Sequence, residues 1–334
     1  MSADDAATPD DTALSEGHRE AFLDVYETRS PRAQHQLDLF ADQWTSKVPI
    51  LGEETISGPR DDLFHDERIQ WGLEALGPIT GMTVLELGPL EGAHTTLLEE
   101  RGAGQVVAVE AHRQAFLRCL VVKNLLGLRA HFELGDFVGH LREYETTWDL
   151  CVATGVLYHL HDPLELIALL GQRARRVLLW THYWDDDVMA RRPDVAERFD
   201  EVEPVQRHGL SATYHRYGYG TGVNDPTFCG GSRTHARWME RNDILDGLAA
   251  VGFERIDTGF DDPFWPHGPA LCVAAARPDA VSRHPQPRTR ARRWREGQRG
   301  PEVEAPWKQA ARRLTWLTRR RGSPTRPPEP PAAP

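Results

Sequence analysis

Short apolar segments alternate with helical patterns between residues 83 and 181, and this alternation restricts the folds open to the chain. Each apolar segment is only a few residues long and has few polar side chains, which is typical of strands buried on both faces of a parallel sheet. Helices must then cover both faces of that sheet. We therefore expect an α/β fold with a doubly wound, mostly parallel sheet of seven strands. The expected strands are residues 83–87, 105–109, 129–134, 149–153, 176–181, 253–259 and 270–276. The expected helices between them are residues 92–101, 112–126, 137–143, 162–172 and 234–250.

The residues before this alternation are expected to be helical. Residues 1–60 form a predicted N-terminal extension, with two helices over 15–45 that are broken at Ser30–Pro31, where serine can cap a helix that begins with proline. A further helix is expected over 61–77, where apolar side chains recur at helical spacing. We place the start of the main domain, 61–276, at this helix.

An insert and a tail interrupt or follow the main domain. Residues 184–232 are too long for an ordinary connection, and we expect them to cover the ligand edge of the sheet as a lid. Residues 277–334 are rich in proline and arginine and are expected to be mostly disordered, with one short helix at about 305–320.

Charge is distributed unevenly along the chain. Residues 277–334 hold 15 basic and 5 acidic side chains, so the first 276 residues carry a net charge of −21 against −11 for the whole chain. An acidic body repels phosphate backbones, which disfavours nucleic acid as its partner. The basic tail suits an acidic partner, nucleic acid or the body itself, and its partner stays unknown.

Several classes of protein are disfavoured by features that the sequence lacks. It has no apolar run of 18 residues and no basic-then-apolar leader, so neither a membrane span nor a secretory signal is expected. The four cysteines are scattered without a C-x-x-C pair, which argues against a zinc site or disulfides and fits a reducing cytoplasm. We therefore expect a cytoplasmic location.

The segment Thr83–Thr95 reads as a strand, a glycine turn and the start of a helix. The apolar run reaches Glu86, the chain turns at Gly88, and the helix starts near Gly92. Such a turn presents backbone N–H groups to a ligand. Glu110 ends the next strand, at the spacing of an acidic residue that holds a ribose. A dinucleotide site is the rival interpretation, and Leu90 at its second glycine position disfavours it.

Further polar residues follow the later strands, at the edge where open parallel sheets bind ligands. Gly135-Asp136-Phe137 follows the third strand, and Thr154 precedes Gly155-Val156-Leu157-Tyr158-His159 after the fourth. With the glycine turn and Glu110, these segments make residues 82–182 resemble class I S-adenosylmethionine-dependent methyltransferases, and the 155–159 segment is similar to methyltransferase-like enzymes that modify the tRNA wobble uridine. The resemblance implies a Rossmann-like methyltransferase fold with S-adenosylmethionine as the cofactor.

The resemblance also implies roles for residues along the cofactor. The backbone of the turn from Gly88 and Pro89 to Gly92 would approach the methionine part, and Glu86 would hold the turn or bind the ammonium group. Thr154 would lie near the sulfonium.

At the nucleoside end, Glu110 would accept hydrogen bonds from both ribose hydroxyls, and Asp136 would bind the adenine amino group with Phe137 beside the ring. Two simpler roles stay open: Asp136 can cap the following helix, and Phe137 can belong to the core.

The acceptor side offers His182, His159 and Tyr158 as candidate catalytic residues. A hydroxyl acceptor needs a base near neutral pKa, which suits histidine. We favour His182, which ends the fifth strand at the root of the insert, although it can equally serve only to orient substrate or to hold structure. No metal is expected, because neither H-x-x-x-H nor H-E-x-x-H occurs at these positions.

These observations favour methyl transfer from S-adenosylmethionine to an oxygen or nitrogen of a small-molecule acceptor. Two alternatives remain: an enzyme that modifies the tRNA wobble uridine, and a regulatory or scaffold protein that binds the cofactor without catalysis.

Overall fold

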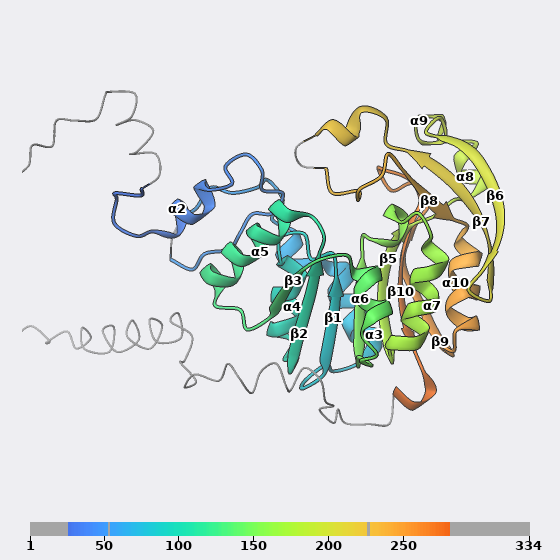
Figure 1. Ribbon diagram of the computed structural model, residues 1–334, viewed down its shortest axis with the longest axis horizontal. Coiled ribbons are helices and arrows are strands. Elements are labelled where there is room, and N and C mark those ends of the chain that lie inside the picture. Colours follow the sequence, from blue (N-terminus) through green and yellow to red (C-terminus); the bar gives the residue numbers. More distant parts are fainter. Residues whose placement is uncertain (1–25, 53, 226–227, 281–334) are drawn as a thin grey trace, which may run out of the picture.

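A seven-stranded sheet in the order β3-β2-β1-β4-β5-β10-β9 forms the centre of the computed structural model, which describes residues 26–52, 54–225 and 228–280 (Figure 1). Strands β1 to β5 are parallel to one another, and β10 is antiparallel to both β5 and β9. The predicted doubly wound, mostly parallel sheet is therefore confirmed. The strands are β1 (Thr83–Leu87), β2 (Gln105–Glu110), β3 (His131–Leu134), β4 (Leu150–Thr154), β5 (Arg176–His182), β9 (Arg255–Asp262) and β10 (Ala270–Ala276).

Three helices cover each face of the sheet. Side chains of β1 alternate between the two cores, because successive residues of a strand point to opposite faces: Val84 packs on one side, and Leu85 and Leu87 on the other. One face is covered by α3 (Glu67–Leu76), α4 (Ala93–Glu100) and α5 (Arg113–Leu126), and the other by α6 (Phe137–Glu143), α7 (Pro163–Arg173) and α10 (Arg241–Ala250). None of the helices in the described ranges is long and apolar enough to cross a membrane.

A second, antiparallel sheet corrects the prediction for residues 234–250. It has the order β6-β7-β8, with β6 (Phe199–Arg207), β7 (Leu210–Gly218) and β8 (His235–Met239), so the first third of the predicted helix is a strand. Trp238 and Met239 are buried on β8, which pairs with β7 over five positions. A five-residue segment is too short for its periodicity to separate strand from helix, and the pairing with a distant strand decides its conformation.

Two strands of this sheet, β6 and β7, belong to the predicted insert, whose role as a lid stays a prediction. The insert begins with the short helices α8 (Asp186–Met189) and α9 (Pro193–Ala196), and η3 (Gly220–Asn224) follows the β6–β7 hairpin. Strands β7 and β8 pack against α7, α10 and the 3₁₀ helix η2 (Leu157–His159), at one side of the main sheet (Figure 1). Because the second sheet includes β8, this sheet extends past residue 232, the predicted end of the insert.

The N-terminal segment is less helical than expected. Residues 26–60 contain one helix in the described part, α2 (Ala33–Asp38), followed by turns that place Trp44 and Val48 against α4 and α5. The predicted helix over 61–77 is divided into η1 (Leu63–His65) and α3. The division falls at Asp66, whose side chain caps α3 by accepting a hydrogen bond from the backbone N–H of Arg68.

The C-terminal tail is described only at its start, the 3₁₀ helix η4 (Pro278–Ala280). Residues 1–25 and the tail from 281 onward, with the predicted helix at 305–320, lie outside the described residues.

The packing of α3 on β5 depends on Gly72, because a Cβ at this position would overlap the side chain of Leu178. We expect Gly72→Ala to lower the free energy of unfolding by about 1–3 kcal/mol through overpacking. The matched control is Gly139→Ala on α6, where a Cβ would meet only Asp136 atoms at 3.8 and 3.9 Å. The control should raise stability by about 0.5–1 kcal/mol, since alanine favours helix more than glycine does. Chemical denaturation measures both values, and equal effects would contradict the packing argument.

Candidate functional site

A cavity of about 1380 Å³ lies at the carboxyl ends of the parallel strands. Its volume exceeds the roughly 300–1,000 Å³ of a typical small-ligand pocket, so it has room for two ligands side by side. Glu86 and Gly92 do not line the cavity. Among the described residues of the insert, Cys229, Gly231 and Ser232 line it, as does Arg233 directly after the insert. The other predicted site residues all line it: Gly88, Pro89, Glu110, Asp136, Phe137, Thr154, Tyr158, His159 and His182.

The turn between β1 and α4 keeps a glycine-like backbone where the sequence lacks a glycine. Gly88, Leu90 and Gly92 have φ angles of 66°, 57° and 80°. A leucine in this left-handed conformation costs about 1–2 kcal/mol. Hydrogen bonds offset this cost, because the Leu90 N–H donates to Glu110 Oε2 at 3.1 Å and its carbonyl accepts from the Cys119 thiol at 3.5 Å.

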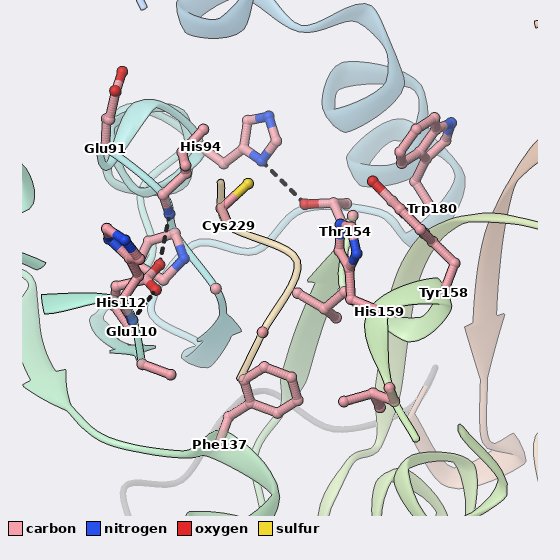
Figure 2. A pocket seen from close by; sticks show the side chains of 18 of the residues that line it. Glu91, His94, Glu110, His112, Phe137, Thr154, Tyr158, His159, Trp180 and Cys229 are labelled. Carbon is pink, nitrogen blue, oxygen red and sulfur yellow. Dashed lines mark hydrogen bonds between the residues drawn. The ribbon is translucent and has the colours of Figure 1, made fainter. Parts of the chain in front are cut away.

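Glu110 holds this turn against the next strand end. Its side chain is buried, and Oε1 accepts a hydrogen bond from the backbone N–H of His112 at 2.7 Å while Oε2 accepts from Leu90 (Figure 2). Burial raises the pKa of Glu110, and these backbone N–H groups oppose that rise. Each carboxyl oxygen keeps a lone pair for a further donor at the cavity wall.

Glu86 lies behind the turn rather than in the cavity. Thr95 Oγ1 donates to Glu86 Oε2 at 2.5 Å, which joins β1 to the first turn of α4. Its other oxygen, Oε1, is buried without a hydrogen-bond partner, and burial raises the pKa of the group. Of the two roles left open for Glu86, this geometry favours holding the turn.

Asp136 and Phe137 begin α6 at the far end of the cavity. Asp136 Oδ1 accepts a hydrogen bond from the Val138 N–H at 2.9 Å, so the capping role is present. Phe137 packs partly against the core and partly lines the cavity. Both residues retain a surface toward a ligand, and their adenine-binding role stays a prediction.

Thr154 belongs to a chain of polar side chains that the sequence analysis missed. Its hydroxyl lies 3.0 Å from His94 Nδ1 (Figure 2). His94 Nε2 lies 2.9 Å from Asp66 Oδ2. Arg68 donates from Nε and Nη2 to the same carboxylate at 2.9 and 2.6 Å. Burial alone would raise the pKa of Asp66, but the bonds from His94 and Arg68 outweigh it and hold the pKa well below its usual range. His94 stands within the glycine-turn segment, but nothing in the sequence indicates that Asp66, 28 residues earlier, contacts it.

His182 lines the cavity beside aromatic rings. The ring is buried, stacked on Trp238 at 4.9 Å, and its Nδ1 lies 3.0 and 3.1 Å from the carbonyl oxygens of Gly268 and Pro269. Carbonyls only accept hydrogen bonds, so Nδ1 carries the hydrogen and Nε2 keeps a lone pair. Burial lowers the pKa of His182 to about 4, which leaves the ring neutral at neutral pH.

Tyr158 and His159 lie in η2, next to His182. The Tyr158 ring meets the His182 ring edge-on at 4.6 Å, and burial raises the pKa of its phenol. His159 Nδ1 is 2.7 Å from the Tyr219 hydroxyl, and burial lowers the pKa of His159 to about 3. Trp180 and Trp265 also line this part of the cavity and meet edge-on at 5.8 Å.

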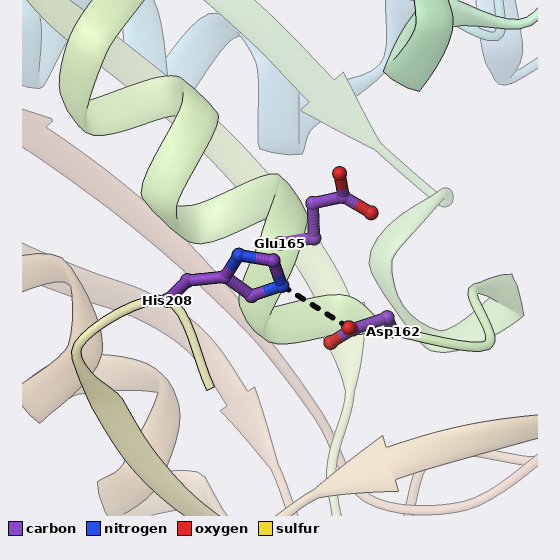
Figure 3. Close-up of side chains that lie close together, drawn as sticks. All are labelled: Asp162, Glu165 and His208. Atoms are coloured by element: carbon purple, nitrogen blue, oxygen red, sulfur yellow. Dashed lines mark hydrogen bonds and ion pairs between the residues drawn. The ribbon is translucent and has the colours of Figure 1, made fainter. Parts of the chain in front are cut away.

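Asp162, Glu165 and His208 approach one another closely enough to hold a metal ion (Figure 3). Arg142, however, bonds both oxygens of Glu165 at 2.5 and 2.6 Å. Asp162 accepts from the Tyr214 hydroxyl at 2.7 Å and pairs with His208 Nε2 at 3.2 Å. These carboxylates are already matched by protein donors, so the cluster fastens the β6–β7 hairpin to the start of α7.

Glu91 connects the N-terminal segment to the glycine turn, a role the sequence analysis did not foresee. The buried carboxylate accepts hydrogen bonds from the backbone N–H groups of Thr45 at 2.9 Å and Ser46 at 2.7 Å. Arg118 Nε lies 3.1 Å from the same carboxylate, and both side chains are almost fully buried. Residues 45–46 thereby form part of the cavity wall.

Removal of this carboxylate should destabilise the protein strongly. Glu91→Ala leaves the buried Arg118 without its counter-charge and two N–H groups without their acceptor, so we expect a loss of about 3–5 kcal/mol in the free energy of unfolding. Glu100→Ala, at an exposed position of the same helix, should change it by less than about 0.5 kcal/mol. Urea denaturation compares the two variants, and a similar small effect in both would contradict the anchoring role.

No protein-family model and no curated protein matches the sequence significantly. Solved structures do match its fold. The N-terminal domain of EvdMO1, solved in the presence of SAH and D-fucose, is 21% identical, with a TM-score of 0.55 over 73% of this chain and 94% of that one. The same domain with SAH bound is 20% identical, with a TM-score of 0.54 over the same shares. An S-adenosylmethionine-dependent methyltransferase from Mesorhizobium loti is 13% identical, with a TM-score of 0.43 over 64% of this chain and 100% of that one. The sheet order and the EvdMO1 likeness together show that the chain has the Rossmann-like methyltransferase fold.

Proposed function

We propose that this protein transfers a methyl group from S-adenosylmethionine to a hydroxyl oxygen of a small, polar acceptor. The observation that carries the proposal is a single cavity with two chemically different ends. One end has the buried carboxylate of Glu110 with Asp136 and Phe137, and the other has the rings of Trp180 and Tyr158. A nucleoside cofactor and an acceptor bound at these ends would meet near Thr154.

The residues at the first end fit the cofactor. The free lone pairs of Glu110 suit the two ribose hydroxyls, and Asp136 and Phe137 suit an adenine. Gly88 brings the backbone close to the methionine part, where a Cβ would lie 2.8 Å from the Val156 side chain. When bound, the cofactor supplies an electrophilic methyl group on a positively charged sulfur. Negatively charged side chains around the cofactor stabilise that positive charge.

The acceptor end combines flat apolar surfaces with a few polar groups. Trp180, Trp265 and Tyr158 offer ring faces and edges, and His182 offers a neutral nitrogen that can accept a hydrogen bond from a hydroxyl. This combination suits a hydroxylated ring of sugar size. The EvdMO1 domain was solved in the presence of D-fucose, which makes that sugar a reasonable first probe.

The chain's own part in the reaction is mainly to position the acceptor. Alignment of the acceptor oxygen with the methyl carbon can lower the barrier by several kcal/mol. His182 would accept a hydrogen bond from another hydroxyl of the acceptor, which orients the acceptor ring so that the reacting oxygen faces the methyl group. Modification of tRNA and a scaffold role stay predictions, and no contact in the site favours either one over this proposal.

The proposed cofactor site leads us to expect that substitutions of its acidic residues weaken S-adenosylmethionine binding, whereas a substitution outside it does not. Glu110→Gln and Asp136→Asn should each weaken S-adenosylmethionine binding by about 10–100-fold, because each removes a charge-assisted hydrogen bond. Glu143→Gln, an exposed change on the same helix as Phe137, should leave the dissociation constant within about twofold. Isothermal calorimetry measures all three values. Unchanged affinity in both site variants would refute the assignment.

The proposed acceptor site can be tested with a sugar as the substrate and with a substitution of His182. D-fucose incubated with the protein and the cofactor should gain one methyl group, detected by mass spectrometry, if the acceptor is a sugar of this size. His182→Gln should then raise KM more than it lowers kcat, since the ring orients the hydroxyl rather than the cofactor. Cofactor binding without methylation of any hydroxylated metabolite in a cell extract would favour the scaffold alternative instead.

A further inference from the structure

Three side chains from three elements form a continuous hydrogen-bonded row in the cavity wall. Thr154 ends β4, His94 lies in the first turn of α4, and Asp66 caps α3. The hydroxyl-to-Nδ1 distance is 3.0 Å and the Nε2-to-carboxylate distance is 2.9 Å. A hydroxyl, an imidazole and a buried carboxylate in this order also form the triad of serine hydrolases. Here Thr154 and His94 both line the cavity, next to the expected position of the sulfonium.

The direction of each hydrogen bond follows from which groups carry a hydrogen and which can only accept one. Arg68 donates twice to the Asp66 carboxylate, which keeps that group ionised and able only to accept. His94 Nε2 must therefore carry a hydrogen, and in the neutral ring Nδ1 is left to accept from the Thr154 hydroxyl. The threonine oxygen retains lone pairs that a second hydroxyl can reach from the cavity.

Methyl transfer to a hydroxyl releases a proton, and the site needs a group that can take it. His182 is poorly suited as that group, because carbonyl oxygens face its Nδ1 and no ion pair joins it to a carboxylate among the described residues. His94 has the Asp66 carboxylate directly behind it, 2.9 Å away. An imidazolium formed at His94 would be stabilised by that charge.

Building on the proposed function, we propose that Thr154, His94 and Asp66 form a proton relay for the acceptor hydroxyl. The acceptor oxygen forms a bond to the methyl carbon, and the electron pair of the broken carbon–sulfur bond stays on sulfur. The acceptor proton passes to Thr154 Oγ1, and the proton of Thr154 passes to His94 Nδ1. The products are the methyl ether, the neutral thioether and an imidazolium beside Asp66, so that charge and protons balance.

The charges around His94 favour transfer of the proton to this ring after the methyl group leaves the sulfur rather than before. Asp66 and Arg68 face it from the start of α3, and Glu86 interacts with it from β1. The thiol of Cys229 reaches the same region from the insert (Figure 2). A sulfonium beside Thr154 disfavours a second positive charge on His94 before transfer. Once the methyl group has left, that positive charge is gone and protonation of His94 becomes easier.

The first test observes the ring directly. In the full-length protein saturated with S-adenosylmethionine, the ¹⁵N resonances of the His94 ring are assigned by comparison with His94→Gln. The relay requires the neutral form at pH 7.5, protonated on Nε2 and unprotonated on Nδ1. An imidazolium, or a hydrogen on Nδ1, overturns the relay. Absence of cofactor binding in calorimetry would instead count against the proposed function, so the two failures are distinguishable.

The second test uses turnover of D-fucose, or of whichever hydroxylated acceptor the extract experiment identifies. Thr154→Val and His94→Gln should each lower kcat by about 10²–10⁴-fold while S-adenosylmethionine affinity stays within about threefold. Thr154→Ser keeps the hydroxyl and should retain most of kcat. Full activity of Thr154→Val, or a loss of kcat in Thr154→Ser as large as in Thr154→Val, overturns the relay.

Discussion

The buried carboxylate of Glu110 is the interaction on which the rest of the site depends. It accepts one hydrogen bond from Leu90 in the β1–α4 turn and one from His112 after β2, and so joins two neighbouring strand ends. The left-handed conformation of Leu90 is held in this way without the glycine that usually permits it. Because the same carboxylate faces the cavity, the group that stabilises the turn is also the group we assign to the ribose. Stability and binding at this edge of the sheet are therefore coupled through one side chain.

Two other buried acids, Glu91 and Asp66, follow the same logic and are matched by defined donors. Glu91 holds the N-terminal segment through two backbone N–H groups and Arg118, and Asp66 holds His94 and Arg68. Ionised groups are stable in a protein interior only with such partners. Each of these acids ties an element outside the sheet to the region of the β1–α4 turn, which closes the cavity on the side where the sulfonium is expected. The acidic character of the body is thus partly a property of the site and not only of the solvent-exposed surface.

The main sheet and half of the site could be predicted from the sequence because they depend on local patterns. Short apolar strands, and an acidic or glycine residue at the end of each of the first four, are visible in the chain without knowledge of its packing. Other features required distant contacts. Residues 235–239 became a strand through pairing with β7, and part of the insert joins them in a second sheet beside the main one. The extension proved mostly non-helical in the described part, because its backbone turns to reach Glu91.

By itself, the sequence determined the order of the strands and helices of the main sheet, the edge at which its parallel strands end and the acidic residues Glu110 and Asp136 at that edge. These follow from periodicity and from the rule that parallel strands end at one edge. Only the tertiary structure decided which side chains work together. It placed Asp66 behind His94 and Thr154, and it buried His182 against backbone carbonyls, so that a carboxylate faces one histidine and carbonyl oxygens face the other. The physical reason is that proton affinity depends on burial and on the nearest charges, and these are set by residues far apart in the chain.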